Sequence, residues 1–551
     1  MRSMSAEIAS FRKIPWFVPL FAAYPIVFLA GQNVGQVSGG TPWVLAVVAI
    51  AATLLTYGIL RLRARSATGA GVAAVCVLVF FFAYPVAQAG IQEAVSHLGP
   101  KSRGILVTAG STPTLRILLP AIWALMAVAA ADRIARSAWA TRPEVDKTFT
   151  FAAIALLVLA SVPIAASASR ALRGTADEGS EISVDGRAAA ATGSPDVYYI
   201  VLDGYARADV LKREYGFDNS EFLDGLRQRG FQVADQSSAN YGWTFLSLAS
   251  TLNLGYLDDA FPSQMDPANR DRSVVNEGIR NNETARFLRR QGYEIVHVQS
   301  TYYATASNPH ADREIKCEQQ IYDDEFVRAV VEASWLGALR SKASVDLADC
   351  HRGNFRALGR MEKSPRPKFV FAHFIVPHHP YLFDRDGKVL RNATISNQFE
   401  AQKRLWEDKA SYVSQLEYVN RLVTAALDGI LASSSQPPVI VLASDHGPNL
   451  SNSLAGIQYA AVRLANFSAY FLPDAPADLM PQDGSAVNQF RRILSHYFGA
   501  NLEPLPDRYF LSPYGRPFDM HEVPADALRR AWNDTSTAQA TSAVAANREH
   551  N

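Results

Sequence analysis

The amino-acid sequence predicts two parts: an N-terminal α-helical membrane domain with five spans, and a C-terminal α/β domain with a mainly parallel sheet. Two observations predict this division. Apolar stretches of about 20 residues, the length needed to cross a bilayer, recur through the first third of the chain. Beyond them, short runs rich in β-branched and aromatic residues alternate with polar, helix-like segments. We place the membrane domain at 1–168, a linker at 169–194, the α/β domain at 195–522 and a disordered tail at 523–551.

Length and charge limit the classes of protein to consider. At 551 residues the chain is too long for one ordinary domain. Lys and Arg number 53 against 52 Asp and Glu, a balance that argues against nucleic acid as a partner. The cysteines have no metal-like spacing, which argues against a zinc finger. Cys317 and Cys350 could pair in an oxidising compartment, and the sequence leaves that pairing open.

The apolar stretches are the predicted membrane spans. Each is long enough for a helix to cross a hydrocarbon core of about 30 Å, and no convincing signal-peptide cleavage site follows the first one. They cover Ile14–Gly35, Pro42–Leu60, Ala70–Gly90, Leu115–Ala135 and Phe149–Ser167.

Basic residues set the predicted orientation of these spans. The N-terminus and the loops after the second and fourth spans carry clusters of Arg and Lys, such as Arg61, Arg63 and Arg65, whereas residues 32–41 carry no charge. Basic loops stay in the cytoplasm. An odd number of spans then puts the α/β domain outside, at the periplasmic face of a bacterial inner membrane.

The more polar part of the chain predicts strands alternating with helices. Near-continuous apolar strands separated by helices are typical of a parallel sheet buried on both faces. The expected strands are Val197–Leu202, Phe231–Ala234, Glu294–Val298, Phe369–Val376, Val439–Ala443 and Ser468–Leu472, and the clearest helices are Ser220–Arg229, Thr284–Gln291 and Ala410–Ala432.

Three of these strands deliver polar side chains to one expected rim of the sheet. Asp203 directly follows the first strand, Asp445-His446 follows the fifth, and the strand that contains His373 leads into His378-His379. Ligands bind beyond the carboxyl ends of parallel strands. Two carboxylates and a histidine at that rim form a plausible site for one divalent cation, with Zn or Mn favoured.

A hydroxyl-rich segment follows the second expected strand. Ser238, Thr244 and Ser247 lie where a polar lead-in changes to an apolar helical pattern, and Thr244 falls near the expected helix start. Backbone N–H groups at a helix start favour a phosphate or sulfate anion. A bound cation would lower the pKa of a hydroxyl that it ligates and so create a nucleophile. Spacing alone does not separate the three hydroxyls.

Together the motifs resemble those of a known family. Leu202-Asp203-Gly204, Tyr241-Gly242-Trp243-Thr244, His378-His379-Pro380-Tyr381 and Ser444-Asp445-His446-Gly447 are similar to the motifs of sulfatase-like hydrolases and transferases in the alkaline-phosphatase superfamily. The closer likeness is to the membrane-anchored branch, which includes lipoteichoic acid synthase, phosphoglycerol transferases and lipid A phosphoethanolamine transferases. The resemblance covers about Pro195–Tyr514 and implies an alkaline-phosphatase/sulfatase-like fold.

The resemblance also implies a role for each matching residue. The metal ligands would be Asp203, Thr244, Asp445 and His446, with Thr244 also the nucleophile, and His378 would contact the transferred or leaving group. Further candidates for substrate binding are His373, His379, Arg207 and Arg463. For His373 a satisfied position in the core is the competing interpretation.

Two departures from the family narrow the chemistry. The transferases often place extra histidines for a second metal after Asp-His-Gly, whereas only His496 occurs between Pro448 and Met520, so we expect one metal ion. True sulfatases carry a Cys or Ser in a Cys-x-Pro-x-Arg-type motif that is converted to an aldehyde. Neither Cys317 nor Cys350 stands in such a motif, which favours phosphorus chemistry over sulfate chemistry.

The function predicted from the sequence is a metal-dependent transferase of the cell envelope. It would move a phosphoglycerol or phosphoethanolamine head group from a membrane lipid donor to an envelope glycan or lipid acceptor, through a phospho-threonine intermediate. A phosphodiesterase or sulfatase-type hydrolase on the same scaffold is the alternative, because loops build the acceptor pocket. A catalytically inactive scaffold for envelope assembly is the third interpretation.

Overall fold

The computed structural model describes residues 14–34, 40–96, 113–174, 194–317, 325–339, 343–390 and 399–533. The chain divides into two compact units. The helical unit comprises Met1–Arg173 and Asp324–Ser341, and the α/β unit comprises Gly174–Asp323 and Lys342–Asn551. The predicted start of the linker needs correction, because residues 169–174 continue the helix Pro143–Gly174, whereas 175–193 lie outside the described residues.

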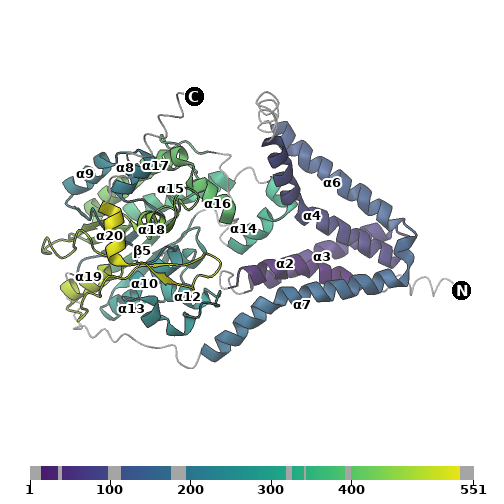
Figure 1. Cartoon of the computed structure of the whole chain (residues 1–551), viewed down its shortest axis with the longest axis horizontal. Helices are drawn as coiled ribbons and strands as arrows, with labels where there is room; N and C mark the ends of the chain where they lie inside the picture. The colour runs from purple at the N-terminus through teal and green to yellow at the C-terminus, as the bar shows by residue number, and fades with distance from the viewer. Residues whose placement is uncertain are drawn as a thin grey trace. The chain divides into compact units, whose positions relative to one another are not determined.

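Apolar helices make up the helical unit (Figure 1). They are α2 (Phe17–Gln32), α3 (Thr41–Arg61), α4 (Ala67–Ser96), α6 (Pro113–Ala135) and α7 (Pro143–Gly174). Within the described residues, α3, α4, α6 and α7 are long and apolar enough to cross a membrane, whereas α2 is a shorter apolar helix. Large apolar side chains such as Leu55, Val128 and Phe151 are exposed on their outer faces, as expected where lipid is the solvent. The fifth span and the orientation of the spans stay predictions.

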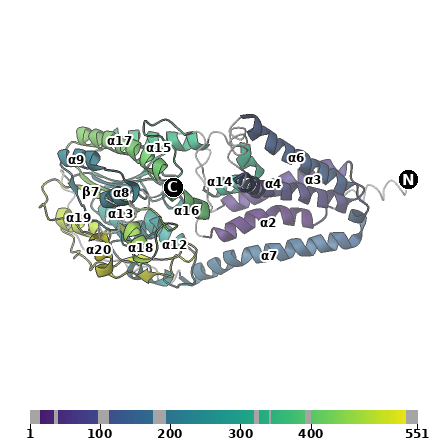
Figure 2. The same cartoon turned by 45° about the horizontal axis from the view of Figure 1, so that its top comes forward.

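A segment from the middle of the chain also belongs to the helical unit. Its helix α14 (Glu325–Glu332) contacts α2 and α3, and its 3-10 helix η5 (Trp335–Leu339) contacts α4 and α6. Figure 2 shows α14 beside the ends of these helices. We call Asp324–Ser341 the excursion, because the chain leaves the α/β unit before it and returns after it.

The α/β unit is built on a sheet with the strand order β2-β7-β6-β1-β5-β3-β4. Strand β1 pairs in parallel with β5 and β6, and β3 pairs in parallel with β5 and β4. Only the β6–β7 and β7–β2 pairings of this sheet are antiparallel within the described residues. The strands are β1 (Val197–Leu202), β2 (Gln232–Val233), β3 (Glu294–Val298), β4 (Arg313–Ile315), β5 (Lys368–Phe374), β6 (Val439–Ala443) and β7 (Ser468–Phe471).

Helices cover both faces of this sheet, and apolar clusters fill the space between the layers. One face packs against α10 (Thr244–Leu252), α12 (Ser273–Arg280), α13 (Glu283–Arg290) and α19 (Asn488–Phe498). The other packs against α8 (Ala208–Tyr215), α9 (Ser220–Gln228), α15 (Ala343–Gly359) and α17 (Lys409–Ser433). The predicted fold class, an apolar helical part followed by an α/β part with a mostly parallel sheet, is confirmed.

Shorter elements complete the α/β unit. They are α11 (Leu257–Ala260), η2 (Pro262–Gln264), η3 (Tyr303–Thr305), α16 (Phe399–Trp406), α18 (Gly456–Leu464), β8 (Phe510–Leu511), β9 (His521–Glu522) and α20 (Ala525–Asn533), while η1 (Trp139–Thr141) lies in the helical unit.

The start of the predicted disordered tail needs correction. Helix α20 lies inside the range 523–551, and its Leu528 and Ala531 are buried against residues of α18. The indole N–H of Trp532 donates to the backbone carbonyl of Ala461 over 2.7 Å. Apolar side chains at helical spacing hold this segment on the fold, and residues 534–551 lie outside the described residues.

Candidate active site

Strand alternation explains why three polar side chains meet at one rim of the sheet. Successive side chains of a strand point to opposite faces. Val201 of β1, Phe371 of β5 and Ala443 of β6 all pack in the cluster on the α10 face. Two residues further along each strand direction stand Asp203, His373 and Asp445. All three therefore continue the face that α10 covers.

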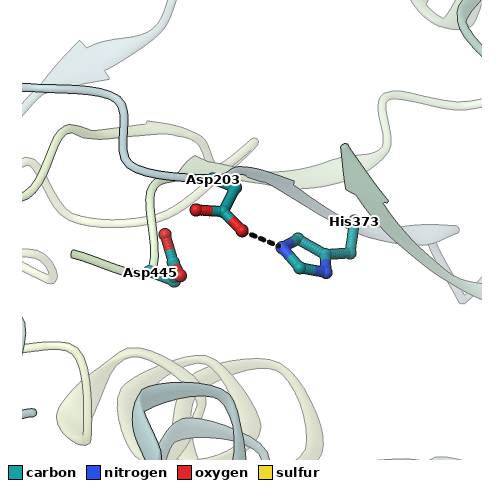
Figure 3. Close-up of side chains that lie close together, drawn as sticks. All are labelled: Asp203, His373 and Asp445. Carbon is teal, nitrogen blue, oxygen red and sulfur yellow. Dashed lines mark ion pairs between the residues drawn. The ribbon is translucent and has the colours of Figure 1, made fainter. Parts of the chain in front are cut away.

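The strand register brings these three residues together. His373 pairs with Val201, and Val201 pairs with Ala443 on its other side. Ligand atoms of Asp203, His373 and Asp445 lie within 4.8 Å of one another, and all three side chains are buried. Figure 3 shows the imidazole of His373 turned toward the carboxylate of Asp203, with 3.6 Å between Nε2 and Oδ2.

Unpaired polar atoms make this cluster a good fit for a cation. Oδ1 of Asp203, Nε2 of His373 and Oδ2 of Asp445 are buried without a hydrogen bond. The opposite atoms are held in place: Oδ1 of Asp445 accepts from the Gly204 N–H over 2.9 Å, and Nδ1 of His373 lies 2.8 Å from the Thr305 hydroxyl. Unpaired buried carboxylates are costly, and carboxylate oxygen with imidazole nitrogen suits Zn or Mn. The cluster therefore has the donors that a divalent ion needs.

The two carboxyl groups hold opposite pKa shifts. Burial and the neighbouring charge of Asp203 raise the pKa of Asp445. Burial alone would also raise the pKa of Asp203, but the nearby histidines, first His378, outweigh it and hold that pKa well below its ordinary value. Two carboxylates that share a small buried space repel each other. A cation between them would remove that repulsion.

His446 presents one ring nitrogen to the same space. Its Nδ1–H donates to the backbone carbonyl of Gly447 over 3.0 Å, which leaves Nε2 as the acceptor. Nε2 lies 3.1 Å from Oδ2 of Asp445. Burial and the charge of Arg463 lower the pKa of His446 well below its ordinary value. The neutral ring is in the form that binds a metal.

The first residue of α10 is Thr244, and its hydroxyl faces this nitrogen. Oγ1 of Thr244 lies 3.1 Å from Nε2 of His446. The N–H groups of the first turn of α10 point out of the helix at the same place, which favours an anion. The hydroxyl of Ser247, one turn later, donates to the backbone carbonyl of Asp445 over 2.7 Å. This contact fixes α10 to the loop that follows β6.

The sequence did not decide which of three hydroxyls is the candidate nucleophile, and the structure places the three in different surroundings. Ser238 is fully buried, and its hydroxyl donates to the phenol oxygen of Tyr509 over 3.1 Å. The Ser247 hydroxyl is occupied by the Asp445 carbonyl. Thr244 is half-buried and faces His446. Of the three, Thr244 is the one placed to reach a ligand.

Arg463 places a buried cation beside the same histidine. The side chain is 3% exposed. Its Nε donates to the carbonyl of Gly242 and its Nη1 to the carbonyl of Gly447, each over 2.7 Å, and Nη2 lies 3.1 Å from Nε2 of His446. The guanidinium also lies over the ring of Trp243, 4.9 Å from its centroid. Within the described residues no carboxylate forms an ion pair with Arg463, so its charge is available to an anion.

The other predicted substrate residues differ in their surroundings. His378 is half-buried, and its backbone N–H donates to the carbonyl of Asp203 over 3.2 Å. His379 is buried, and its Nε2 has no hydrogen bond. Burial and the neighbouring His378 lower the pKa of His379. Both rings lie beside Trp406. Arg207 instead pairs with Asp209, at 2.7 Å and 2.9 Å.

His373 is the site residue whose role the sequence left most open, between a core position and a substrate contact. Its ring nitrogen also belongs to a group that could hold a metal, which adds a third interpretation. The signal was available, because His373 keeps the two-residue period of Phe369 and Phe371, which face α10. Thr305, which fixes the ring through Nδ1, had no sequence signal at all.

Comparison with known proteins gives one family. The family model described as Sulfatase matches residues 195–491, more than half of the chain. A search of curated proteins finds no match.

Several solved structures resemble the chain at low identity. The C-terminal periplasmic domain of EcEptC from Escherichia coli is 11% identical over 62% of this chain and 95% of that one, with a TM-score of 0.41. The lipooligosaccharide phosphoethanolamine transferase A (EptA) from Neisseria meningitidis is 13% identical over 87% and 94%, with a TM-score of 0.38. A protein in the alkaline phosphatase superfamily from Vibrio parahaemolyticus is 13% identical over 63% and 80%, with a TM-score of 0.36. These values assign no substrate to this chain.

Proposed function

The chain belongs to the sulfatase family, and on that premise we propose that it moves a phospho-head group from a membrane lipid to an envelope lipid or glycan. The chain is a sulfatase-like phosphotransferase or hydrolase. In the proposal the donor is a lipid with a phosphoglycerol or phosphoethanolamine head group, and the nucleophile is Thr244. The reaction takes place at the periplasmic face of a bacterial inner membrane.

One observation carries the proposal. The Thr244 hydroxyl lies 3.1 Å from His446 Nε2 at a helix N-terminus, next to a buried Asp-His-Asp group with unpaired ligand atoms. A threonine hydroxyl, a group of side chains that could hold a metal ion and a helix N-terminus therefore lie at one rim. That combination suits transfer of an anionic phosphoryl group.

The residues that would hold the metal are Asp203, Asp445, His446 and Thr244, with His373 as an additional donor. A divalent ion bound there would lower the pKa of the Thr244 hydroxyl and neutralise charge on the phosphoryl oxygens. The tautomer of His446 is preset by its Gly447 contact, so the ring does not have to reorganise. The Thr305 hydroxyl holds the His373 ring in place through its 2.8 Å contact with Nδ1.

The protein's own groups account for the remaining steps. In the first half the Thr244 hydroxyl loses its proton to solvent, Oγ1 attacks phosphorus, and the bond from phosphorus to the diacylglycerol oxygen breaks as the new O–P bond forms. In this proposal the protonated side chain of His378 gives its proton to that leaving oxygen and becomes neutral. Arg463 and the first N–H groups of α10 stabilise the negative charge that develops on the phosphoryl oxygens. In the second half the acceptor hydroxyl gives its proton to the neutral His378, its oxygen attacks phosphorus in line, and the bond from phosphorus to Oγ1 of Thr244 breaks.

The helical unit supports a lipid donor over a soluble one. Four of its helices are long and apolar enough to cross a membrane. An enzyme anchored in the bilayer meets a lipid substrate at a high effective concentration without further contacts. A soluble phosphodiester would gain nothing from such an anchor.

The test uses the full-length protein in vesicles of phosphatidylethanolamine and phosphatidylglycerol, with lipid A and a periplasmic glucan offered as acceptors. We expect diacylglycerol release and an acceptor heavier by one phospho-head group in mass spectra, both lost in Thr244→Ala. Diacylglycerol with free head group and no modified acceptor would favour the hydrolase. Absence of diacylglycerol from the wild type, with metal present, would overturn the proposal.

A further inference from the structure

The excursion is packed into the helical unit by apolar contacts. Phe326 of α14 is 3% exposed and lies in one cluster with Ile26, Ala30 and Ala46. Val330, one turn further along α14, packs against the same cluster. Burying an aromatic ring of this size is a strong contact. The first half of the excursion is therefore fixed on α2 and α3.

A second contact fixes the other half of the excursion. The indole N–H of Trp335 donates to the backbone carbonyl of Pro120 in α6 over 3.1 Å. Leu336, the next residue, is 43% exposed. Trp335 is thus tied to α6, while Leu336 is exposed on the helical unit.

The chain segments before and after the excursion are joined to each other inside the α/β unit. Cys317 and Cys350, whose pairing the sequence left open, form a disulfide, with 5.0 Å between their Cα atoms. Cys317 precedes the excursion and Cys350 follows it in α15. The side-chain amide of Asn354 lies 3.6 Å and 3.8 Å from the two sulfurs and donates to the Gln299 carbonyl over 2.6 Å. The chain thus leaves for the excursion and returns from it near one anchored point, the Cys317–Cys350 disulfide.

That anchored point lies at the rim of the metal site. Cys317 follows the carboxyl end of β4, and Gln299 follows the carboxyl end of β3. Both strands run parallel to β5 and β1, so their carboxyl ends share the rim that carries His373 and Asp203. The chain leaves for the helical unit from the side of the sheet where the chemistry would take place.

Chain length makes this connection much tighter than the N-terminal linker. About seven residues (318–324) join Cys317 to the start of α14, and an extended chain of that length reaches at most about 25 Å. About 19 residues (175–193) lie between α7 and the α/β fold, which allows a reach of about 65 Å. The shorter connection through the excursion, and not the linker, therefore limits the distance between the metal-site rim and the helical unit.

We propose that the excursion is a tether that keeps the metal-site rim within reach of the bilayer and so restricts the enzyme to donors in the membrane. The proposal rests on the proposed function for its substrate, the phosphodiester head group of a bilayer lipid. Without the tether, the α/β unit would hang on the long linker alone. Lipid donors would then meet the site at a much lower effective concentration.

The experiment compares two substrates in full-length protein reconstituted in vesicles of phosphatidylethanolamine and phosphatidylglycerol. The variant is Phe326→Ala with Trp335→Ala, which removes both fixed points and leaves the α/β unit untouched. The control is Trp139→Ala, which removes another tryptophan of the helical unit, outside the excursion. Release of diacylglycerol measures turnover of the lipid substrate. Hydrolysis of the soluble diester bis(p-nitrophenyl) phosphate measures whether the active site itself still works.

We expect the double variant to lose about tenfold or more in lipid turnover, in line with a lower effective concentration, while hydrolysis of bis(p-nitrophenyl) phosphate stays within about twofold of the wild type. Trp139→Ala should change neither. An equal fall on both substrates, or no fall on either, would overturn the proposal.

Two further measurements do not depend on activity, so they separate this proposal from the proposed function. Hydrogen exchange over 325–339 should be slow in the wild type and fast in the double variant. A fluorophore on Asn452→Cys, an exposed position on the loop after Asp445, should be quenched by nitroxide-bearing lipids in a Cys76→Ser background. Equal quenching with and without the two tether residues would rule the tether out, whether or not any lipid is turned over.

Discussion

The hydroxyl oxygen of Thr244 lies 3.1 Å from Nε2 of His446, across 202 positions of sequence. The contact joins the start of α10 to the loop after β6, and Ser247 adds a second link to the same loop. A threonine at a helix start is commonly a cap, but the N-cap of α10 is Trp243 and Thr244 makes no capping contact there. Its hydroxyl is therefore free to serve the site.

Replacing Thr244 tests this assignment. Thr244→Ala should lower kcat by about 10³-fold or more, because a missing nucleophile removes the covalent step. Thr244→Ser keeps the hydroxyl and should retain a measurable rate. Thermal unfolding of both variants should match the wild type, because the half-buried side chain contributes little packing. Wild-type turnover by Thr244→Ala would show that another group attacks phosphorus.

Metal binding distinguishes the two interpretations of His373. If its Nε2 is a ligand, His373→Gln should weaken binding of Zn or Mn by more than the roughly 10–100-fold that loss of a partner behind a ligand costs. The measurement is titration of the chelator-treated protein with each metal. An unchanged metal affinity with a raised KM would instead make His373 a substrate residue.

Removal of the metal should also lower stability. An ion that binds only the folded state contributes about 2.7 kcal/mol at a concentration 100 times its Kd. The buried, unpaired oxygens of Asp203 and Asp445 gain most from it. Unfolding of the chelated protein should therefore begin at lower temperature and recover when metal is returned. Asp445→Asn should show no such metal-dependent shift.

Arg463 should matter for the transferred group and not for the metal. Its three contacts with Gly242, Gly447 and His446 hold the guanidinium beside the Thr244 helix start. Lysine keeps the charge but cannot bond both carbonyls as a planar fork does. We expect Arg463→Lys to lower kcat/KM by about 10²-fold or more, with unchanged metal content. A loss of bound metal would mean that Arg463 acts by positioning His446.

Much of the fold followed from apolar patterning. Strands β1, β3 and β6 have the bounds that the sequence predicted, because each is a short apolar run between turn residues. Strand β4 was missed, because Arg313–Ile315 is short, polar and only half-buried. Helix α14 was missed as a partner of α2 and α3, because its amphipathic pattern does not reveal which surface it covers.

The site could be predicted only in part for a similar reason. Motifs placed Asp203, Asp445 and His446 at strand ends, and those ends lie side by side. The roles of His373 and Arg463 depend on strand register and on the orientation of α18, which come from long-range pairing. A local pattern shows which face of a strand or helix a residue occupies, but not which distant residues it meets there.

Two buried histidines predict how stability depends on pH. Burial lowers the pKa of His297 to about 4, although its contact with the Thr305 carbonyl acts in the opposite direction. Burial and the charge of His373 lower the pKa of His351 to about 4. Both pKa values lie below the unfolded value of about 6.5. Above that pH both states are neutral, so the histidines cost nothing. Below it only the unfolded state gains protons, so stability falls from about pH 6.5 toward pH 4.

The variant His351→Gln should reduce that slope. Each such histidine accounts for about 1.4 kcal/mol per pH unit inside the window. Thermal unfolding of wild type and variant at pH 5 and pH 8 measures the difference. The variant should be closer to the wild type at pH 5 than at pH 8. An identical pH dependence in the two proteins would mean that His351 takes up its proton in the folded state.

The disulfide between Cys317 and Cys350 should stabilise the α/β unit without being needed for the site. It closes a loop with a sequence separation of 33, for which the chain-entropy model gives about 3–4 kcal/mol. Cys317→Ser with Cys350→Ser should lower the unfolding temperature and quicken hydrogen exchange in β4 and α15. Contacts of Phe326 and Trp335 lie in the helical unit, so the excursion itself should stay protected.

Cys76→Ser removes the free cysteine and should change nothing. A reductant that destabilises the double variant as much as the wild type would show that another bond is responsible.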